Sequence, residues 1–251
     1  RQEPRDETKE KGRAQVSADI AKFNAAQAAL DFVKDGMIVG LGTGSTSAHF
    51  VRLLGERVRQ GLRIKGVPTS EATRNLAEQA GIALLEISQV TSIDVDVDGA
   101  DEIDPAFRLV KGGGGALLRE KIVAVASKSM VVIADESKWV ETLGAFPLPV
   151  EVTRFGFALT LERVRRVLRG TKCAGDEVVL RTSGKSNEPV ITDGGNYSLD
   201  AHAQSIPAPE DLGAALKDIA GVVEHGLFLN LARTVILGQA KGAVIKAHES
   251  F

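Results

Sequence analysis

The sequence predicts an α/β fold in which a Rossmann-like parallel sheet is flanked by helices. From about residue 17 to residue 134, short apolar runs alternate with segments of helical spacing. This alternation is typical of a parallel sheet that is covered on both faces. Pro147 and Pro149 then make a stiff connection. The segments beyond it indicate a smaller α+β domain of the ferredoxin-like type, inserted before the C-terminal strands.

The first half of the chain supplies the elements of the parallel sheet. Apolar residues recur at helical spacing over residues 17–33, 46–59, 71–80 and 116–126, and Ser17 is a candidate N-cap for the first of these helices. Buried strands are expected at residues 37–42, 63–67, 83–87, 93–98 and 130–134. Strands and helices therefore alternate over most of this half.

The second half predicts a separate small sheet. Strands are expected at 150–153 and 177–182, helices at 157–168 and from Pro209, a hairpin turn at 193–196, and a strand from Val222. The apolar runs at 227–230, 234–237 and 243–246 are expected to return in part to the first sheet. The predicted division is a disordered, charged tail at 1–14, an α/β domain at 15–145 plus 223–251, and the ferredoxin-like domain at 146–222.

Composition excludes several classes of protein. With 251 residues, 43% hydrophobic content and a formal net charge of −2, the chain is an ordinary globular protein and lacks the basic excess of a nucleic-acid binder. No apolar run approaches the ~18 residues of a membrane span, and the charged N-terminus lacks a secretion signal. The single cysteine, Cys173, excludes an internal disulfide. We therefore expect a cytoplasmic protein with no nucleic-acid or membrane partner.

The densest group of charged residues and glycines lies between Asp98 and Lys121. The alternating segment 93–98 should deliver Asp98 at the carboxyl end of a strand, where open α/β sheets bind ligands. Glycines 112–115 give the backbone freedom to approach a ligand. The following helix carries Glu120. We therefore expect four charged side chains to converge on one pocket: Asp98, Asp101, Lys111 and Glu120. This set suits acid/base chemistry on a sugar carbon.

Each of these features also has a plainer interpretation. Asp-Gly is a common turn, a glycine run can be a linker, and Glu or Lys in a helix usually faces solvent. A glycine quartet is, however, a poor linker inside an α/β domain with short connections. The three carboxylates of Asp94, Asp96 and Asp98 share one strand face and would be costly to bury without a purpose.

The glycine-rich turn after the first strand is a second candidate ligand site. It offers backbone N–H groups and a helix N-terminus to an anion at residues 43–46, although a plain capped turn would have the same composition. A P-loop would need a lysine, which is absent, and the dinucleotide fingerprint would need glycine where Ser45 stands. The turn therefore favours a sugar phosphate over NAD.

Together these motifs resemble the type A ribose-5-phosphate isomerases. The resemblance rests on Asp98-Gly-Ala-Asp-Glu-Ile-Asp104, Lys111-Gly-Gly-Gly-Gly-Ala116, Leu118-Arg-Glu-Lys-Ile122 and the turn that begins at Gly40. It extends to Pro68-Thr-Ser-Glu71, Ile133-Ala-Asp-Glu-Ser-Lys138 and Phe146-Pro-Leu-Pro-Val-Glu-Val152, and it covers nearly the whole chain from about Ser17. It implies an aldose–ketose isomerase that interconverts D-ribose 5-phosphate and D-ribulose 5-phosphate through an enediolate, in the non-oxidative pentose phosphate pathway. It also implies a homodimer.

The resemblance implies a role for each site residue. Glu120 matches the general base that moves a proton between C1 and C2, and Asp98 matches the residue for ring opening. Lys111, with the N–H groups of residues 112–114, would stabilise the enediolate oxygen, and Asp101 would orient sugar hydroxyls or Lys111. A lysine near Lys22 reaches the phosphate in the family. The implied substrate-binding set is Thr43, Gly44, Ser45, Thr46, Asp98, Gly99, Ala100, Asp101, Lys111, Gly112, Gly113, Gly114 and Lys138.

Two alternatives remain open from the residues, whereas a metal site is disfavoured. The four histidines are dispersed without ligand spacing, so a His-based metal site is not expected, and the lysines near the carboxylates favour a site with no metal and no cofactor. Deaminases, lactonases and CoA-transferases share this type of fold, so another reaction on a phosphosugar is an alternative. A ligand-sensing regulator is the other, although the segment before Ser17 is too short for a DNA-binding module.

Overall fold

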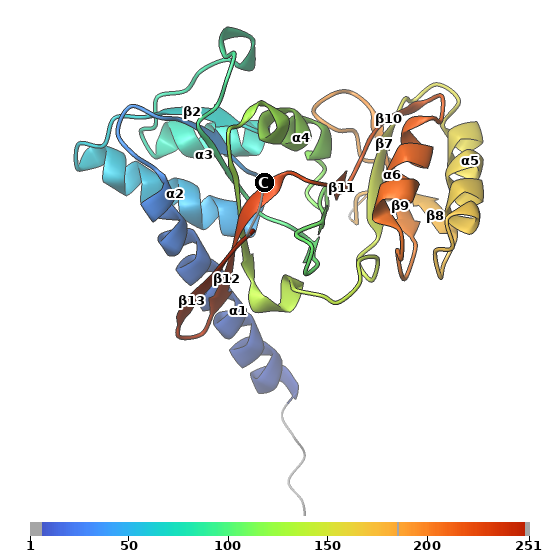
Figure 1. The fold of residues 1–251 in the computed structure, drawn as a ribbon, viewed down its shortest axis with the longest axis horizontal. Helices are drawn as coiled ribbons and strands as arrows, with labels where there is room; N and C mark the ends of the chain where they lie inside the picture. The colour runs from blue at the N-terminus through green and yellow to red at the C-terminus, as the bar shows by residue number, and fades with distance from the viewer. Residues whose placement is uncertain (1–6, 185, 249–251) are drawn as a thin grey trace, which may run out of the picture.

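The computed structural model describes residues 7–184 and 186–248. Within them the chain forms three sheets (Figure 1). The largest has the order β13-β12-β6-β3-β1-β2 and is parallel except for the edge strand β13, which pairs antiparallel with β12. Its strands are β1 (Ile38–Leu41), β2 (Lys65–Pro68), β3 (Val95–Asp98), β6 (Met130–Asp135), β12 (Ala232–Gln239) and β13 (Gly242–Ala247). The predicted α/β fold with a parallel sheet is confirmed.

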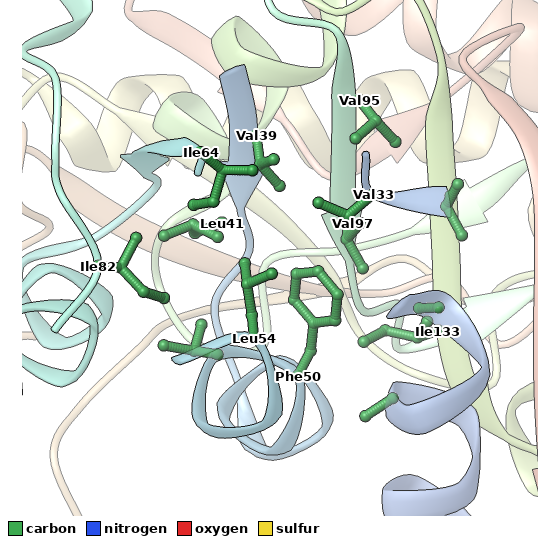
Figure 2. Packing of buried hydrophobic residues seen from close by; sticks show 14 of the residues in the cluster. Val33, Val39, Leu41, Phe50, Leu54, Ile64, Ile82, Val95, Val97 and Ile133 are labelled. Atoms are coloured by element: carbon green, nitrogen blue, oxygen red, sulfur yellow. The ribbon is translucent and has the colours of Figure 1, made fainter. Parts of the chain in front are cut away.

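Helices cover both faces of this sheet, and apolar residues of strands such as β1 and β6 are buried on both sides. On one face lie α1 (Glu7–Ala29) with the short turn η1 (Leu30–Phe32), α2 (Ser45–Arg59) and α3 (Glu71–Gln79). Figure 2 shows Phe50 and Leu54 of α2 packed against Leu41 of β1, with Val97 and Ile133 of the neighbouring strands in the same core. The other face is covered by α4 (Leu117–Ala126), whose Val123 packs with the strand residue Val67.

The second sheet is antiparallel and has the order β10-β7-β9-β8. Its elements are β7 (Leu148–Val152), α5 (Phe157–Gly170), β8 (Glu177–Leu180), β9 (Tyr197–His202), α6 (Pro209–Lys217) and β10 (Val222–His225). Val164 and Leu168 of α5 and Leu212 and Leu216 of α6 close its core. The βαββαβ order is that of the ferredoxin-like type, as predicted. Because β10 ends at His225, this sheet runs three residues past the predicted boundary at 222, and the division into domains stays a prediction.

A small third sheet joins these two parts of the molecule. It comprises β4 (Glu102–Ile103), β5 (Leu109–Val110) and β11 (Leu227–Phe228), in the order β11-β5-β4. Its strand β11 follows β10 of the antiparallel sheet and precedes β12 of the parallel sheet, so the chain passes through it on its return. The residues just before β4 and just after β5 are those of the candidate site.

One local prediction was wrong. The expected strand at 83–87 does not form, because after the bridge between Leu84 and Gly66 a capped turn at Glu86 redirects the chain into η2 (Ile87–Gln89). The charged tail, for which a disordered or loosely helical state was expected, is helical from Glu7. This stretch is rich in Glu, Lys and Arg, which extend an existing helix at little cost. Residues 1–6 of that predicted tail lie outside the described residues.

None of the described helices combines the length and apolarity that crossing a membrane requires.

Candidate active site

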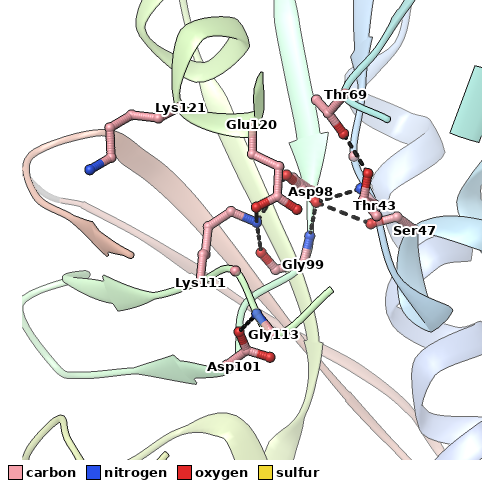
Figure 3. Close-up of polar contacts among 12 residues, drawn as sticks. Thr43, Ser47, Thr69, Asp98, Gly99, Asp101, Lys111, Gly113, Glu120 and Lys121 are labelled. Carbon is pink, nitrogen blue, oxygen red and sulfur yellow. Dashed lines mark hydrogen bonds and ion pairs between the residues drawn. The ribbon is translucent and has the colours of Figure 1, made fainter. Parts of the chain in front are cut away.

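Asp98 ends strand β3 and is fully buried. One carboxylate oxygen, Oδ1, accepts from the backbone N–H groups of Thr43 (3.0 Å) and Gly99 (2.7 Å) and from the hydroxyl of Ser47 (3.3 Å). The other oxygen, Oδ2, lies 2.9 Å from Nζ of Lys111 (Figure 3). The carboxylate therefore ties the glycine-rich turn after β1 to the lysine that follows β5.

Lys111 is 2% exposed and lies between two carboxylates. Its ammonium group donates to the carbonyl oxygen of Gly99 at 2.6 Å, and its Nζ is 2.9 Å from Asp98 and 3.5 Å from Oε2 of Glu120. Burial opposes the charge, but the two carboxylates outweigh it and raise the pKa of Lys111 above its ordinary value. The group is therefore a fixed positive charge at the centre of the site.

Glu120 lies in the first turn of α4 and is 4% exposed. Burial, followed by repulsion from Asp98, raises the pKa of its carboxyl group to about 8, although Lys111 opposes the shift. A carboxyl group with a pKa near neutrality both accepts and returns protons at physiological pH, as a general acid–base group must.

A third buried carboxyl group, Asp96, lies behind Asp98 on the same face of β3. Among the described residues, neither of its oxygens has a hydrogen-bond partner. Burial and then the negative charge of Asp98 raise its pKa well above the usual value, and Lys111 acts in the opposite direction. Burial and the negative charge of Asp98 therefore favour the neutral form of the Asp96 carboxyl group in the folded protein. The sequence pattern alone assigns it no role.

Gly40 of strand β1 and Gly42, which follows it, make room for these carboxylates. A Cβ atom on Gly40 would lie 2.6 Å from Oδ1 of Asp96, and one on Gly42 would lie 2.0 Å from Oδ1 of Asp98. Both distances are far below van der Waals contact. The two glycines that match part of a dinucleotide fingerprint are thus explained by the packing of β1 against β3.

The turn after β1 is held by hydroxyl groups that the sequence analysis did not single out. The Oγ1 atom of Thr43 lies 2.7 Å from that of Thr69 and 2.9 Å from Oγ of Ser70, and Thr73 donates to the carbonyl of Gly42 at 3.0 Å. Thr69 and Ser70 belong to a motif that carried the resemblance, but nothing in it assigned them a contact. Because α2 begins at Ser45, the unpaired N–H groups of its first turn open at this turn.

Asp101 lies on the other side of the site, next to the glycine loop. Its Oδ2 accepts the N–H of Gly113 at 2.8 Å. The expectation that the Gly113 N–H helps to stabilise a substrate oxygen therefore differs from the structure, because that donor is already bound. Asp101 was also expected to orient Lys111. Lys111 instead contacts Asp98, Gly99 and Glu120.

These groups surround a cavity of about 160 Å³. Apart from Asp98, which lies directly behind Lys111, every predicted site residue lines it: Thr43, Gly44, Ser45, Thr46, Gly99, Ala100, Asp101, Lys111, Gly112, Gly113, Gly114, Glu120 and Lys138. Lys22 of α1 and Asp135 at the end of β6 complete the wall. Within the described part of the chain, no three His, Cys, Asp or Glu side chains are grouped as metal ligands.

A buried carboxyl group with a raised pKa, a buried ammonium ion and the N-terminus of a helix meet at the carboxyl edge of a parallel sheet. The fold and this site define the class of protein, an α/β enzyme with acid–base groups around a small cavity. The family model of ribose 5-phosphate isomerase A (phosphoriboisomerase A) matches residues 65–242 of the chain. The chain belongs to the ribose 5-phosphate isomerase A family.

Individual relatives agree with this assignment. Ribose-5-phosphate isomerase A of Maricaulis maris is 54% identical over 218 residues, which cover 87% of this chain and 94% of that protein. The structure of ribose 5-phosphate isomerase A from Methanocaldococcus jannaschii matches with a TM-score of 0.84 at 39% identity, covering 92% of this chain and 100% of that one. A D-ribose-5-phosphate isomerase in complex with phospho-erythronic acid matches with a TM-score of 0.84 at 39% identity, covering 91% of this chain and 98% of that one.

Proposed function

We propose that this chain interconverts D-ribose 5-phosphate and D-ribulose 5-phosphate through an enediolate, as a step of the non-oxidative pentose phosphate pathway. Membership of the family supports the reaction. The mechanism is carried by one observation, the position of Lys111 between the buried carboxylates of Asp98 and Glu120.

In this mechanism Glu120 is the base that moves the proton between the two sugar carbons. With the sugar in its open form, the carboxylate takes the proton from C2, and the electron pair of that bond forms the enediolate with C1. The C2 hydroxyl passes its proton through Asp98 to the oxygen on C1, which becomes the C1 hydroxyl. The proton on Glu120 is then delivered to C1, and the C2–O bond becomes the ketone. The raised pKa of Glu120, about 8, suits both halves of this exchange.

Asp98 and Lys111 act on the oxygens of the sugar. We assign ring opening and proton transfer between the sugar hydroxyls to Asp98. Its Oδ1 accepts three hydrogen bonds, and its Oδ2 lies 2.9 Å from Nζ of Lys111. Lys111 stabilises the enediolate. When Glu120 accepts the C2 proton its negative charge disappears, and the same amount of charge develops on the enediolate oxygen. The ammonium group thus exchanges one anionic partner for another without moving.

The phosphate group is assigned to the turn at residues 43–46. Its backbone N–H groups open at the start of α2, and Lys22 and Lys138 line the same cavity. Asp101 keeps the glycine loop in place through Gly113 and faces the sugar hydroxyls. We also propose that catalysis needs neither a metal nor a cofactor, and the predicted homodimer stays a prediction.

The test is conversion of ribose 5-phosphate to ribulose 5-phosphate by the purified protein, with and without a chelator. Turnover that is unchanged by the chelator supports the proposal. Turnover that is lost on chelation would keep the isomerase and give the oxyanion role to a metal rather than to Lys111. If there is no turnover and the phosphosugar still protects the protein against heat, the proposal fails in favour of a related reaction or a sensor.

A further inference from the structure

The glycine loop of the site is also held from the antiparallel sheet. Arg181, which follows β8, donates from Nη1 to the carbonyl oxygens of two consecutive loop residues, Gly112 at 2.9 Å and Gly113 at 3.3 Å. These residues line the substrate cavity, whereas β8 is the edge strand of the other sheet. No role for Arg181 follows from the motifs of the site.

The guanidinium group is fixed before it reaches the loop. Its Nε donates to both carboxylate oxygens of Asp200 on β9, at 3.1 and 3.0 Å, and its Nη2 donates to Oδ1 of the same residue. The side chains of Arg181 and Asp200 are 14% and 20% exposed. A two-point pair of this kind sets the plane of the guanidinium group as well as its position.

Holding a carbonyl oxygen also fixes the N–H group on the same peptide plane. In a planar trans peptide the C=O of one residue and the N–H of the next point in opposite directions. Arg181 holds the carbonyls of Gly112 and Gly113 on its own side, and so turns the N–H groups of Gly113 and Gly114 away from itself. The N–H of Gly113 follows this rule, since it is donated to Asp101 at 2.8 Å.

The N–H of Gly114 is the group left for a substrate. Gly114 lines the cavity, and a Cβ atom built on it would lie near only one residue, Thr43 of the turn at 43–46, at 3.6 Å. Within the described residues, the Gly114 N–H makes no hydrogen bond. A carbonyl that accepts from a guanidinium ion also polarises its peptide, which makes that N–H a stronger donor.

We propose that Arg181, fixed by Asp200, is a positioning residue that aims the Gly114 N–H at the oxygen on which negative charge develops during isomerisation. The inference rests on the proposed function, because it assigns that oxygen to the enediolate. It gives the antiparallel sheet a part in catalysis. The Gly112 carbonyl is also held by the Gly115 N–H at 3.0 Å, whereas among the described residues the Gly113 carbonyl accepts from Arg181 alone. Without Arg181, the peptide plane that carries the Gly114 N–H is free to turn, because these glycines have no side chains to limit their backbone.

The test compares Arg181→Ala with Arg165→Ala. Arg165 is the matched control, because it belongs to the same part of the molecule and donates to a backbone carbonyl, that of Val178 at 2.9 Å, away from the cavity. We expect kcat for ribose 5-phosphate to fall about 10- to 100-fold in Arg181→Ala, less than the full loss of an oxyanion donor. We expect KM to change less than about threefold and Arg165→Ala to keep the wild-type kcat.

Two further readouts separate a positioning role from a general loss of structure. Phospho-erythronic acid carries a carboxylate, which resembles the charged enediolate, so its affinity should fall with kcat in Arg181→Ala. The affinity for inorganic phosphate, which we assign to the turn at 43–46, should not change. Guanidinium chloride at millimolar concentration, far below denaturing levels, should restore part of kcat in Arg181→Ala but not in Glu120→Gln.

Wild-type kcat in a folded Arg181→Ala would overturn the inference, and so would equal losses in both arginine variants. If Arg181→Ala does not fold, Asp200→Asn keeps the arginine and weakens its anchor, and the same fall in kcat with unchanged phosphate affinity is expected. Failure of the proposed function shows itself separately, because wild-type protein would then not turn over ribose 5-phosphate at all.

Discussion

At the scale of single residues, the site is governed by an excess of buried carboxyl groups over positive charge. Asp96, Asp98 and Glu120 are buried around one lysine, Lys111. A single ammonium ion cannot balance three carboxylates in a medium of low polarity, so protons must make up the difference. The raised pKa values of Asp96 and Glu120 follow from this imbalance.

Asp96 gives a prediction for stability. Because its pKa is raised in the folded state, the folded protein holds a proton that the unfolded chain releases above about pH 4. Wild-type protein should therefore lose about 1.4 kcal/mol of stability per pH unit relative to Asp96→Asn, for as long as Asp96 stays protonated in the folded state. Urea denaturation at pH 5, 7 and 9 measures this difference, which should grow with pH.

Asp94 on the same strand is the control. Its hydrogen bond with Lys128 lowers its pKa, so its contribution to stability is present above the unfolded pKa and is lost as the pH falls. Asp94→Asn should therefore shift stability in the opposite direction. A pH-independent difference between wild type and Asp96→Asn would show that Asp96 is not a neutral acid in the folded protein.

Residue types and spacing were sufficient to predict most of the site. Asp98, Lys111 and Glu120 stand in motifs specific enough to identify from the sequence, and the strand–loop–helix order brings them together. The two features that could not be predicted are long-range. The raised pKa of Asp96 depends first on its burial by elements that are distant in sequence. The contact of Arg181 with the glycine loop spans 69 residues of sequence.

At the scale of elements, the register of β1 against β3 decides where the carboxylates lie. Gly40 pairs with Asp96 and Leu41 with Val97. Gly42, directly after β1, therefore lies beside Asp98, as Gly40 lies beside Asp96. The sequence showed glycines typical of a ligand-binding turn, and only the register shows that they serve packing as well. The predicted strand at 83–87 failed for a local reason. Its apolar pattern is that of a strand, but the capped turn at Glu86 ends its pairing with β2 after a single bridge.

Gly42→Ala tests this packing. The new methyl group would overlap the carboxylate of Asp98, so either β1 must move or the Asp98–Lys111 pair must open. We expect a loss of about 1–3 kcal/mol in the free energy of unfolding, together with a fall in kcat. Gly170→Ala at the end of α5 is the control, because a Cβ atom there meets nothing within 4 Å. Wild-type stability and turnover in Gly42→Ala would contradict the packing argument.

At the scale of the whole molecule, helix α4, which carries Glu120, is anchored to the antiparallel sheet. Lys121, next to Glu120 on α4, donates to Oε1 of Glu224 at 2.8 Å and to the carbonyl of His225 at 2.6 Å, both on β10. Its Nζ also lies 4.9 Å from the centre of the Phe228 ring. Figure 3 shows Glu120 directed into the site and Lys121 directed away from it, so one turn of helix serves both purposes.

Lys121→Met should loosen this anchor while keeping most of the apolar bulk of the side chain. Removing a buried, charged donor should cost about 1.5–3 kcal/mol in the free energy of unfolding, measured by urea denaturation. Lys128→Met, which removes an exposed pair with Asp94, should cost less than about 1 kcal/mol. Equal effects of the two substitutions would show that α4 does not depend on β10.

The two-part architecture was predictable because the prolines near residue 147 and the change in pattern mark it in the sequence. The contacts between the two parts were not predictable, because those of Lys121 and Arg181 join residues that are separated by about 70 to 100 positions in the chain. No local pattern encodes such pairs.

The central claim is that Glu120 is the base that moves the proton between C1 and C2. The most direct measurement is kcat for ribose 5-phosphate in Glu120→Gln, alongside the affinity of that variant for phospho-erythronic acid. We expect kcat to fall by about 10²- to 10⁴-fold, the usual contribution of a general base, with affinity for the acid retained. A folded Glu120→Gln enzyme with near wild-type kcat would contradict the account, because the proton would then have to pass through another group.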